Sequence, residues 1–135
     1  MIVARIQGAA IDVAALRDQV QQISCGATVA FEGTTRSPSH GHEVRLLRYE
    51  AYESRANTQL HEIAVAAMNR WPLGALAAVH RVGDVPAGDT SVAVVAASPH
   101  RDEAFDACRY VIDRIKSEVA IWKQEVLANG DEQWL

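Results

Sequence analysis

The stretch SPHRDEAFDACRYVIDRIKSEVAIWKQE, residues 98–125, contains the only two lysines of the chain, Lys116 and Lys123. Lysine and arginine together number 13, so the other 11 basic residues are arginines. Arginine stays protonated in proteins, whereas lysine loses its proton when its surroundings disfavour the charge. The two lysines are therefore candidates for nucleophilic or acid–base chemistry, although two lysines on a solvated face would leave the same pattern.

The beginning of this stretch predicts a helix N-terminus. Ser98 is expected as the N-cap and Pro99 as the first helical residue. His100 and Arg101 then fall in the first turn, where free backbone N–H groups and the helix dipole favour anions. These residues fit a binding site for a phosphate or carboxylate, and they fit equally a capped surface helix with incidental polar residues.

The middle of the stretch has apolar residues at helical spacing, which predicts one buried helix face. The members of this face are Phe105, Cys108, Ile112, Ile115 and Val119. Lys116 follows Ile115 directly and is expected at the edge of the face. A cationic helix N-terminus and a lysine at the border of the core together suggest a ligand site.

The end of the stretch is open to two interpretations. One continuous helix would place Lys116 and Lys123 on the same face, because seven residues make nearly two turns. However, Asn129-Gly130 is a strong β-hairpin signal. We therefore expect residues 121–126 and 133–135 to pair as strands, so that the two lysines meet by folding rather than by helical period.

Outward from this stretch, the chain alternates between strand and helix patterns. Strands are predicted at residues 2–7, 27–33, 43–52, 76–82 and 91–97, the last of which is apolar throughout and is expected to be covered on both faces. Asp12 is expected to cap a short helix that buries Leu16, Val20 and Ile23, and residues 53–71 form the first long helix. Residues 34–42 and the segment GDVPAGD at 83–89 are predicted as a loop and a turn.

Composition limits the class of protein. A chain of 135 residues fits one domain, residues 1–135, with a substantial core. The net charge of −4 argues against a general nucleic-acid binder, so any anion site must be built locally. Residues 1–10 lack a sustained apolar region and no apolar run approaches membrane-spanning length, so we expect neither a signal peptide nor a membrane span. Cys25 and Cys108 form no metal or disulfide framework, which favours reduced thiols in the cytoplasm.

Five ordered motifs resemble the large, catalytic subunit family of molybdopterin synthase. They are FEGTTR at 31–36, YEAY at 49–52, HRVG at 80–83, SPHRDEAF at 98–105 and IKSEVAIWKQE at 115–125. Together they cover the chain from about Ala27 to its end. None is specific alone, but five in order over most of a short chain are highly specific.

The resemblance implies an α+β fold with antiparallel sheets and two long helices, in a hammerhead-like arrangement. It implies a cytoplasmic sulfurtransferase that places two sulfurs on cyclic pyranopterin monophosphate and so forms the dithiolene of molybdopterin. The sulfur comes from a small ubiquitin-like partner with a C-terminal Gly-Gly thiocarboxylate. A homodimer of the large subunit with one partner at each end forms a heterotetramer. No cofactor and no metal are expected.

The resemblance also assigns site residues. The catalytic lysine of the family falls on Lys116 and its second essential lysine on Lys123. The substrate-binding positions fall on Thr34, Thr35, Arg36, His100, Arg101, Lys116, Lys123, Gln124 and Glu125. Arginine suits a phosphate because its guanidinium donates hydrogen bonds in pairs, and neighbouring positive charge favours a neutral, reactive lysine. His80, Arg81 and Cys108 are interpreted as structural residues.

Two departures from the family pattern bear on the site. Ala120 stands where the family has proline, so the helix could continue and shift Lys123. Arg55 stands where the family has methionine, which is expected to affect local packing only. The alternative function is a non-enzymatic anion-binding scaffold that docks a ubiquitin-like partner, and such a scaffold would tolerate loss of the lysines. The sequence leaves open a covalent intermediate on Lys116, the order of the two sulfur transfers and the identity of the partner.

Overall fold

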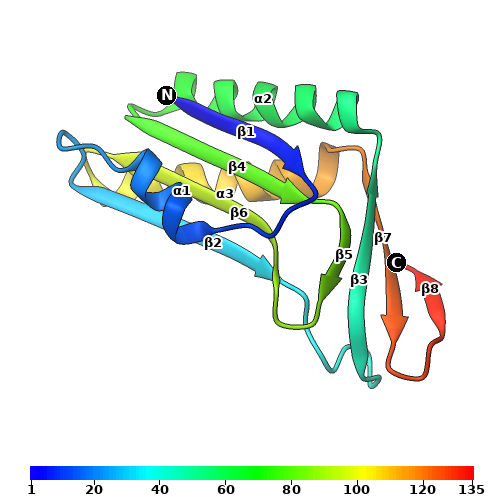
Figure 1. The fold of residues 1–135 in the computed structure, drawn as a ribbon. Helices are drawn as coiled ribbons and strands as arrows, with labels where there is room; N and C mark the ends of the chain where they lie inside the picture. The colour runs from blue at the N-terminus through cyan, green and yellow to red at the C-terminus, as the bar shows by residue number, and fades with distance from the viewer.

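A computed structural model describes all 135 residues, which form two four-stranded sheets and three helices (Figure 1). The strand order of the first sheet is β1-β4-β6-β2, and the order of the second is β5-β3-β7-β8. The first sheet contains β1 (Ile2–Gln7), β4 (Ala75–Arg81), β6 (Thr90–Ser98) and β2 (Ala27–Thr34). Strand β1 pairs with β4 in parallel, and the other pairs are antiparallel.

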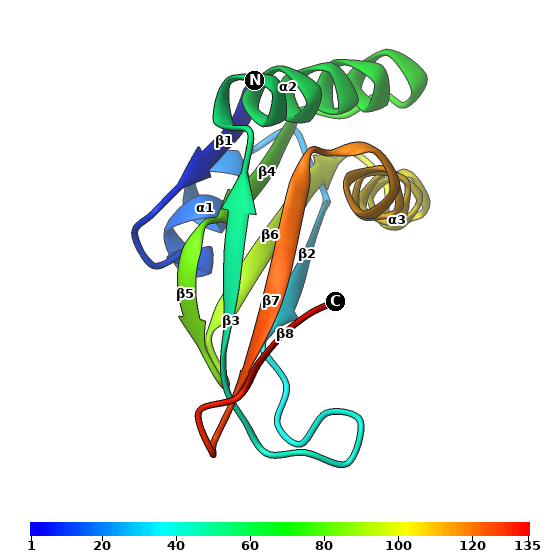
Figure 2. The same ribbon diagram turned by 90° about the vertical axis from the view of Figure 1, so that its right-hand side faces the viewer.

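The first sheet is covered on both faces. Helix α1 (Val13–Val20) packs on one face, and α2 (Glu53–Arg70) and α3 (Arg101–Glu118) pack on the other (Figure 2). In β4, Leu76 and Ala78 join the core under α2 and α3, while Ala77 and Val79 join the core under α1. Because successive strand residues point to opposite faces, a strand covered on both sides needs a continuous apolar run. Strand β6 alternates in the same way, with Val92 and Val94 under α2 and α3 and Ala93 and Val95 under α1, which confirms the prediction for residues 91–97.

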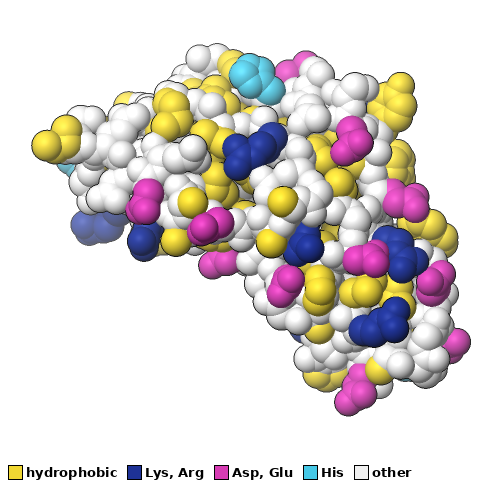
Figure 3. Space-filling view, in the orientation of Figure 1, with side chains coloured by type: hydrophobic (Ala, Val, Ile, Leu, Met, Phe, Trp, Pro, Cys, Tyr) yellow, Lys and Arg dark blue, Asp and Glu magenta, His cyan; other side chains and the backbone are white.

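The second sheet extends from one end of the first (Figure 1). It contains β5 (Gly83–Pro86), β3 (Val44–Ala51), β7 (Ile121–Leu127) and β8 (Glu132–Trp134), all antiparallel. The chain passes from β4 directly into β5 and so links the two sheets. Figure 3 shows basic and acidic side chains interspersed over this region.

The short helix and the segment 83–89 differ in part from expectation. Asp12 caps α1 as predicted, and its Oδ1 accepts a hydrogen bond from the Ala15 N–H at 3.0 Å. Ile23 was expected in the core, but α1 ends at Val20 and Ile23 is fully exposed. Residues 83–86 form strand β5 rather than a turn, because they pair with β3 and bury Val85. Pro86 is tolerated there because β5 is an edge strand.

The predicted start of the long C-terminal helix is also wrong. Ser98 is the last residue of β6 and is fully buried, because β6 pairs with β2 as far as Ala27. Helix α3 begins at Arg101, and the N-cap residue His100 makes no capping hydrogen bond through its side chain. Cys108, Ile112 and Ile115 are buried as predicted.

The C-terminal hairpin is confirmed. Helix α3 ends at Glu118, and β7 and β8 pair across a turn in which Gly130 has φ 93°. Only glycine adopts this conformation readily. Because α3 ends at Glu118, Ala120 in place of proline does not extend the helix.

None of the three helices combines the length and the hydropathy needed to cross a membrane.

Candidate functional site

A pocket of about 270 Å³ lies where the two sheets meet the C-terminal end of α3. Its polar lining includes Lys116 from α3, Lys123 from β7, His80 from β4, Tyr49 from β3 and Thr34 from β2. The two lysines of the chain therefore line one pocket. This confirms that they meet through the fold of the hairpin rather than along one helix.

The local structure explains how the lysines converge. Lys116 lies in the last turn of α3, and the chain then reverses at residues 119–120 into β7. Lys123 is directly opposite Tyr49 of β3, so both side chains lie on the same face of the second sheet. Lys116 remains exposed, whereas Lys123 is half-buried.

The surroundings of Lys123 disfavour its charge. Burial lowers its pKa below the ordinary value, and the positive charge of Lys116 lowers it further. Glu125, two residues away on the same strand face, acts in the opposite direction. The neutral amine of Lys123 is therefore more accessible than that of a solvated lysine, which suits proton transfer or nucleophilic attack.

His80 is a pocket residue that the sequence interpretation treated as structural. It is only 7% exposed, and its Nδ1 lies 2.8 Å from the carbonyl oxygen of Arg81. The imidazole ring of His80 packs edge-to-face against the ring of Tyr49, and the ring centroids are 4.9 Å apart. Burial lowers the pKa of His80 to about 4, and Lys116 and Lys123 contribute in the same direction. The imidazole is therefore neutral at pH 7, and the motif HRVG was the only sequence signal for it.

The predicted segment Lys123–Glu125 divides between the two faces of β7. Glu125 is 1% exposed and accepts a hydrogen bond from Nε2 of Gln133 at 2.8 Å. Gln124 points to the opposite face, where its Nε2 donates to Glu132 at 3.3 Å. Of these three residues, only Lys123 lines the pocket.

The predicted segment Thr34–Arg36 connects the pocket with a neighbouring hollow. Thr34 lines both, and the hollow is completed by Thr35, Arg36 and the turn at Gly88. Thr35 is buried, and its backbone N–H and carbonyl groups bond to Asp89 and Gly88 at 3.0 and 2.8 Å. Arg36 is exposed and has no ion-pair partner within the chain. This segment can present a guanidinium beside the pocket.

His100 and Arg101 lie at the other end of α3. Arg101 and Lys116 are 15 residues apart on one helix, which at 1.5 Å per residue is about 22 Å. Both His100 and Arg101 are exposed. Within a single chain, the predicted binding site is therefore split between two places.

A largely apolar groove of about 510 Å³ runs between β2 and α3 and ends at Lys116. It is lined by Val29, Phe31, Phe105 and Ile112, among others. Phe105 was predicted in the core but is 60% exposed, because it lies on this groove rather than under the sheet.

Cys108 is a packing residue, as predicted. It is buried, its thiol donates to the carbonyl oxygen of Val94 at 3.6 Å, and burial raises its pKa to about 11. The reactive thiolate is therefore disfavoured. The chain contains no group of three or more His, Cys, Asp or Glu residues arranged to hold a metal ion.

The fold defines a class of two-sheet α+β proteins that is known from solved structures. Molybdopterin synthase from Staphylococcus aureus superposes with a TM-score of 0.92 at 32% identity, over 98% of this chain and 96% of that chain. A chain in the complex of subunits 1 and 2 of molybdopterin-converting factor from Helicobacter pylori has the same fold, with a TM-score of 0.79 at 22% identity over 96% and 88% of the two chains.

Sequence comparison identifies the family. The family model described as MoaE protein matches residues 6–118. The molybdopterin synthase catalytic subunit of Oryza sativa subsp. indica is 46% identical over 121 residues, which are 90% of this chain and 63% of that protein. The chain belongs to the MoaE protein family, and it spans somewhat less than two thirds of the length of this plant relative.

Proposed function

We propose that this chain is the catalytic subunit of a molybdopterin synthase. It transfers two sulfurs, one from each of two molecules of a small thiocarboxylated partner, to cyclic pyranopterin monophosphate and forms the dithiolene of molybdopterin. The observation that carries this proposal is the convergence of Lys116 and Lys123, the only lysines of the chain, in one pocket. The catalytic-subunit relative and the Staphylococcus aureus structure support it.

The pocket suits an anionic sulfur donor. A thiocarboxylate carries negative charge, and two lysines at the junction of the sheets attract it while an acidic chain as a whole does not. A neutral lysine acts as base or nucleophile, and a protonated one stabilises negative charge that develops on the substrate. The family resemblance gives the first role to Lys116 and the anchoring role to Lys123. The lowered pKa of Lys123 makes a direct test of this division necessary.

The phosphate of the substrate requires donors beyond the two lysines. Arg36 beside the pocket is one, and the family resemblance adds His100, Arg101, Thr34, Thr35, Gln124 and Glu125. His100 and Arg101 of the same chain are about 22 Å from Lys116 along α3. A second copy of the chain supplies them if the α3 helices of the two copies run antiparallel across the groove beside Phe105. A two-fold axis places each helix N-terminus at the other copy's lysines.

The assembly that follows is a homodimer with one small partner at each end. The Helicobacter pylori complex contains subunits 1 and 2 of molybdopterin-converting factor, one of which has the present fold, and this supports a partner subunit. An extended Gly-Gly tail can pair along the pocket wall while its terminal thiocarboxylate meets the lysines. Action in the cytoplasm stays a prediction.

The decisive experiment is reconstitution. The protein is incubated with a thiocarboxylated β-grasp partner and cyclic pyranopterin monophosphate, and the dithiolene product is detected. A partner that lacks its last two residues should give no product and should bind more weakly. Binding of the intact partner without product would favour the scaffold function instead, and loss of both lysines would then leave that binding unchanged.

A further inference from the structure

The turn between α3 and β7 is held by a side chain from a different helix. Gln59 of α2 donates from Nε2 to the carbonyl oxygen of Glu118 at 2.9 Å. Its Oε1 accepts a hydrogen bond from the backbone N–H of Ala120 at 2.8 Å. The donor and the acceptor on the backbone fix the orientation of the amide, because only one arrangement satisfies both.

The same turn is held from a second direction. The carbonyl oxygen of Ala120 accepts a hydrogen bond from the backbone N–H of Tyr52, at the start of α2, at 3.2 Å. The backbone N–H of Val119 bonds to Ile115 within the helix. Both polar backbone groups of Ala120 are thus bound by the segment at 52–59, and the last carbonyl of α3 has a partner that helix ends normally lack.

The position of this turn decides where the lysines stand. Lys116 is two residues before Glu118, and Lys123 is three residues after Ala120. A longer α3 would rotate the following residues by about 100° for each residue added and would take Lys123 out of its register opposite Tyr49. The place at which α3 ends therefore sets the relative positions of the two amines.

The backbone N–H group of residue 120 is required for this arrangement. A proline at position 120 has no N–H group and cannot donate to Gln59. Proline instead stops a helix by sterics, which alanine, a strong helix former, does not do. In this chain the side-chain amide of Gln59 performs the task that a proline would perform at the turn.

We infer that Gln59 is a positioning residue of the lysine pocket, which ends α3 at Glu118 through its paired hydrogen bonds and so fixes the separation of Lys116 and Lys123. Gln59 itself touches no substrate. The functional part of this inference rests on the proposed sulfur transfer, whereas the structural part concerns the two amines alone.

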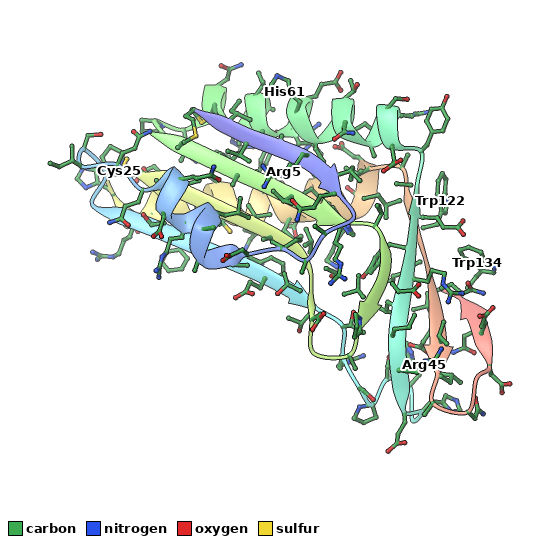
Figure 4. The ribbon with its side chains drawn as sticks, viewed as in Figure 1. Arg5, Cys25, Arg45, His61, Trp122 and Trp134 are labelled. Atoms are coloured by element: carbon green, nitrogen blue, oxygen red, sulfur yellow. The ribbon has the colours of Figure 1, made fainter.

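The test uses Gln59→Leu, which keeps the approximate volume and removes both hydrogen bonds. The matched control is His61→Leu, on the same helix at an exposed position that projects away from the sheet (Figure 4). A second arm uses Ala120→Pro alone and together with Gln59→Leu. Single-turnover sulfur transfer, partner binding and thermal unfolding are measured for each variant.

We expect Gln59→Leu to slow single-turnover transfer about tenfold, with partner binding changed less than twofold and His61→Leu like the wild type. Ala120→Pro alone removes one hydrogen bond from Gln59 but supplies its own helix stop, so it should slow transfer less than Gln59→Leu does. In the Gln59→Leu background the proline restores the helix stop, so the double variant should transfer faster than Gln59→Leu. A double variant that is slower than both single variants, or a normal rate in Gln59→Leu, would overturn the inference.

A second readout is independent of the reaction. Since the chain has only two lysines, selective ¹³C labelling of lysine gives two side-chain signals that can be titrated by NMR. The charged and titratable groups around Lys123 are Lys116 on α3, Glu125 on β7, His80 on β4 and Tyr49 on β3. Separation of the amines in Gln59→Leu should move the pKa of Lys123 toward its ordinary value. An unchanged titration would contradict the positioning role even if the sulfur-transfer proposal itself had failed.

Discussion

Both ends of α3 carry basic side chains, but these lie in different surroundings. At the C-terminal end, Lys116 joins a pocket whose walls come from both sheets of the same chain. At the N-terminal end, His100 and Arg101 stand in solvent with no capping hydrogen bond from the His100 side chain. One end is therefore organised by the fold of a single chain, whereas under the proposed function the other end joins a site only through a second copy of the chain.

The largest effect is expected at the organised end. Lys116→Arg keeps a positive charge but removes an amine that can lose a proton. If Lys116 acts as acid, base or nucleophile, this variant and Lys116→Ala should both lose about 100-fold or more in single-turnover transfer, as general acid–base groups typically contribute. Partner binding, measured separately, should remain. An arginine variant near full activity would show that only the charge matters.

The next effect tests whether the solvent-exposed end serves another copy. Arg101→Ala should lower turnover about 10- to 100-fold without unfolding the protein, because one charge-assisted hydrogen bond is worth roughly 1.5–3 kcal/mol. His100→Ala should act in the same direction. An Arg101→Ala protein that unfolds, with normal affinity in the folded fraction, would mark the residue as structural.

Mixed dimers sharpen this test. When Lys116→Ala and Arg101→Ala chains are refolded together in equal amounts, half of the dimers are mixed and each of these has one intact site. A site shared across a two-fold axis should therefore recover about one quarter of the wild-type activity. If both residues of one chain served the same site, mixing would recover nothing.

A smaller effect is expected for Lys123→Arg. This residue is assigned mainly to anchoring substrate and stabilising charge, and arginine keeps the charge, so the loss should be about tenfold and smaller than for Lys116→Arg. The loss should fall mainly on KM for the substrate. A reversed ranking, with Lys123→Arg the less active variant, would move the proton-transfer role to Lys123, in line with its lowered pKa.

Local patterns predicted much of the fold. The apolar run of β6 and the Asn129-Gly130 hairpin were correct, because each depends on a short segment and on a simple covering or turn rule. The errors lie where distant pairing overrides local preference. Ser98 was predicted as a helix cap but belongs to β6, because it pairs with Ala27 of β2. Residues 83–86, which contain Val85, were predicted as a turn from their Pro and Gly content but form a strand, because they pair with β3.

For the candidate site, the sequence predicted that the two lysines meet, but not which other residues line the pocket around them. The family motifs named both lysines, and the hairpin signal brought them together. The split along α3 was not foreseen, because a motif gives no distance between its ends. His80 was missed because its burial results from the convergence of β3, β4, α3 and β7, which no single segment encodes. Phe105 has core periodicity, and only the open groove beside β2 explains its exposure.

The smallest effect at neutral pH concerns His80, and it tests how strongly the lysine end of α3 is desolvated. The pKa of His80 is lowered from 6.5 to about 4, so the unfolded chain binds more protons between these values. The free energy of unfolding is therefore not reduced by His80 above pH 6.5, and it decreases as the pH falls from 6.5 toward 4. A shift of this size corresponds to on the order of 3 kcal/mol. His80→Phe keeps a ring against Tyr49 and cannot titrate.

Urea unfolding at pH 7, 5.5 and 4.5 should show wild-type stability falling more steeply with acid than that of His80→Phe. The substitution itself should cost about 1 kcal/mol at pH 7, because the Arg81 carbonyl loses its hydrogen bond. His61→Phe, at an exposed position of α2, should follow the wild-type curve. Parallel curves for wild type and His80→Phe would mean that His80 titrates as in solvent. The pocket would then be hydrated, and the two ends of α3 would differ only in that the lysines lie together at one of them.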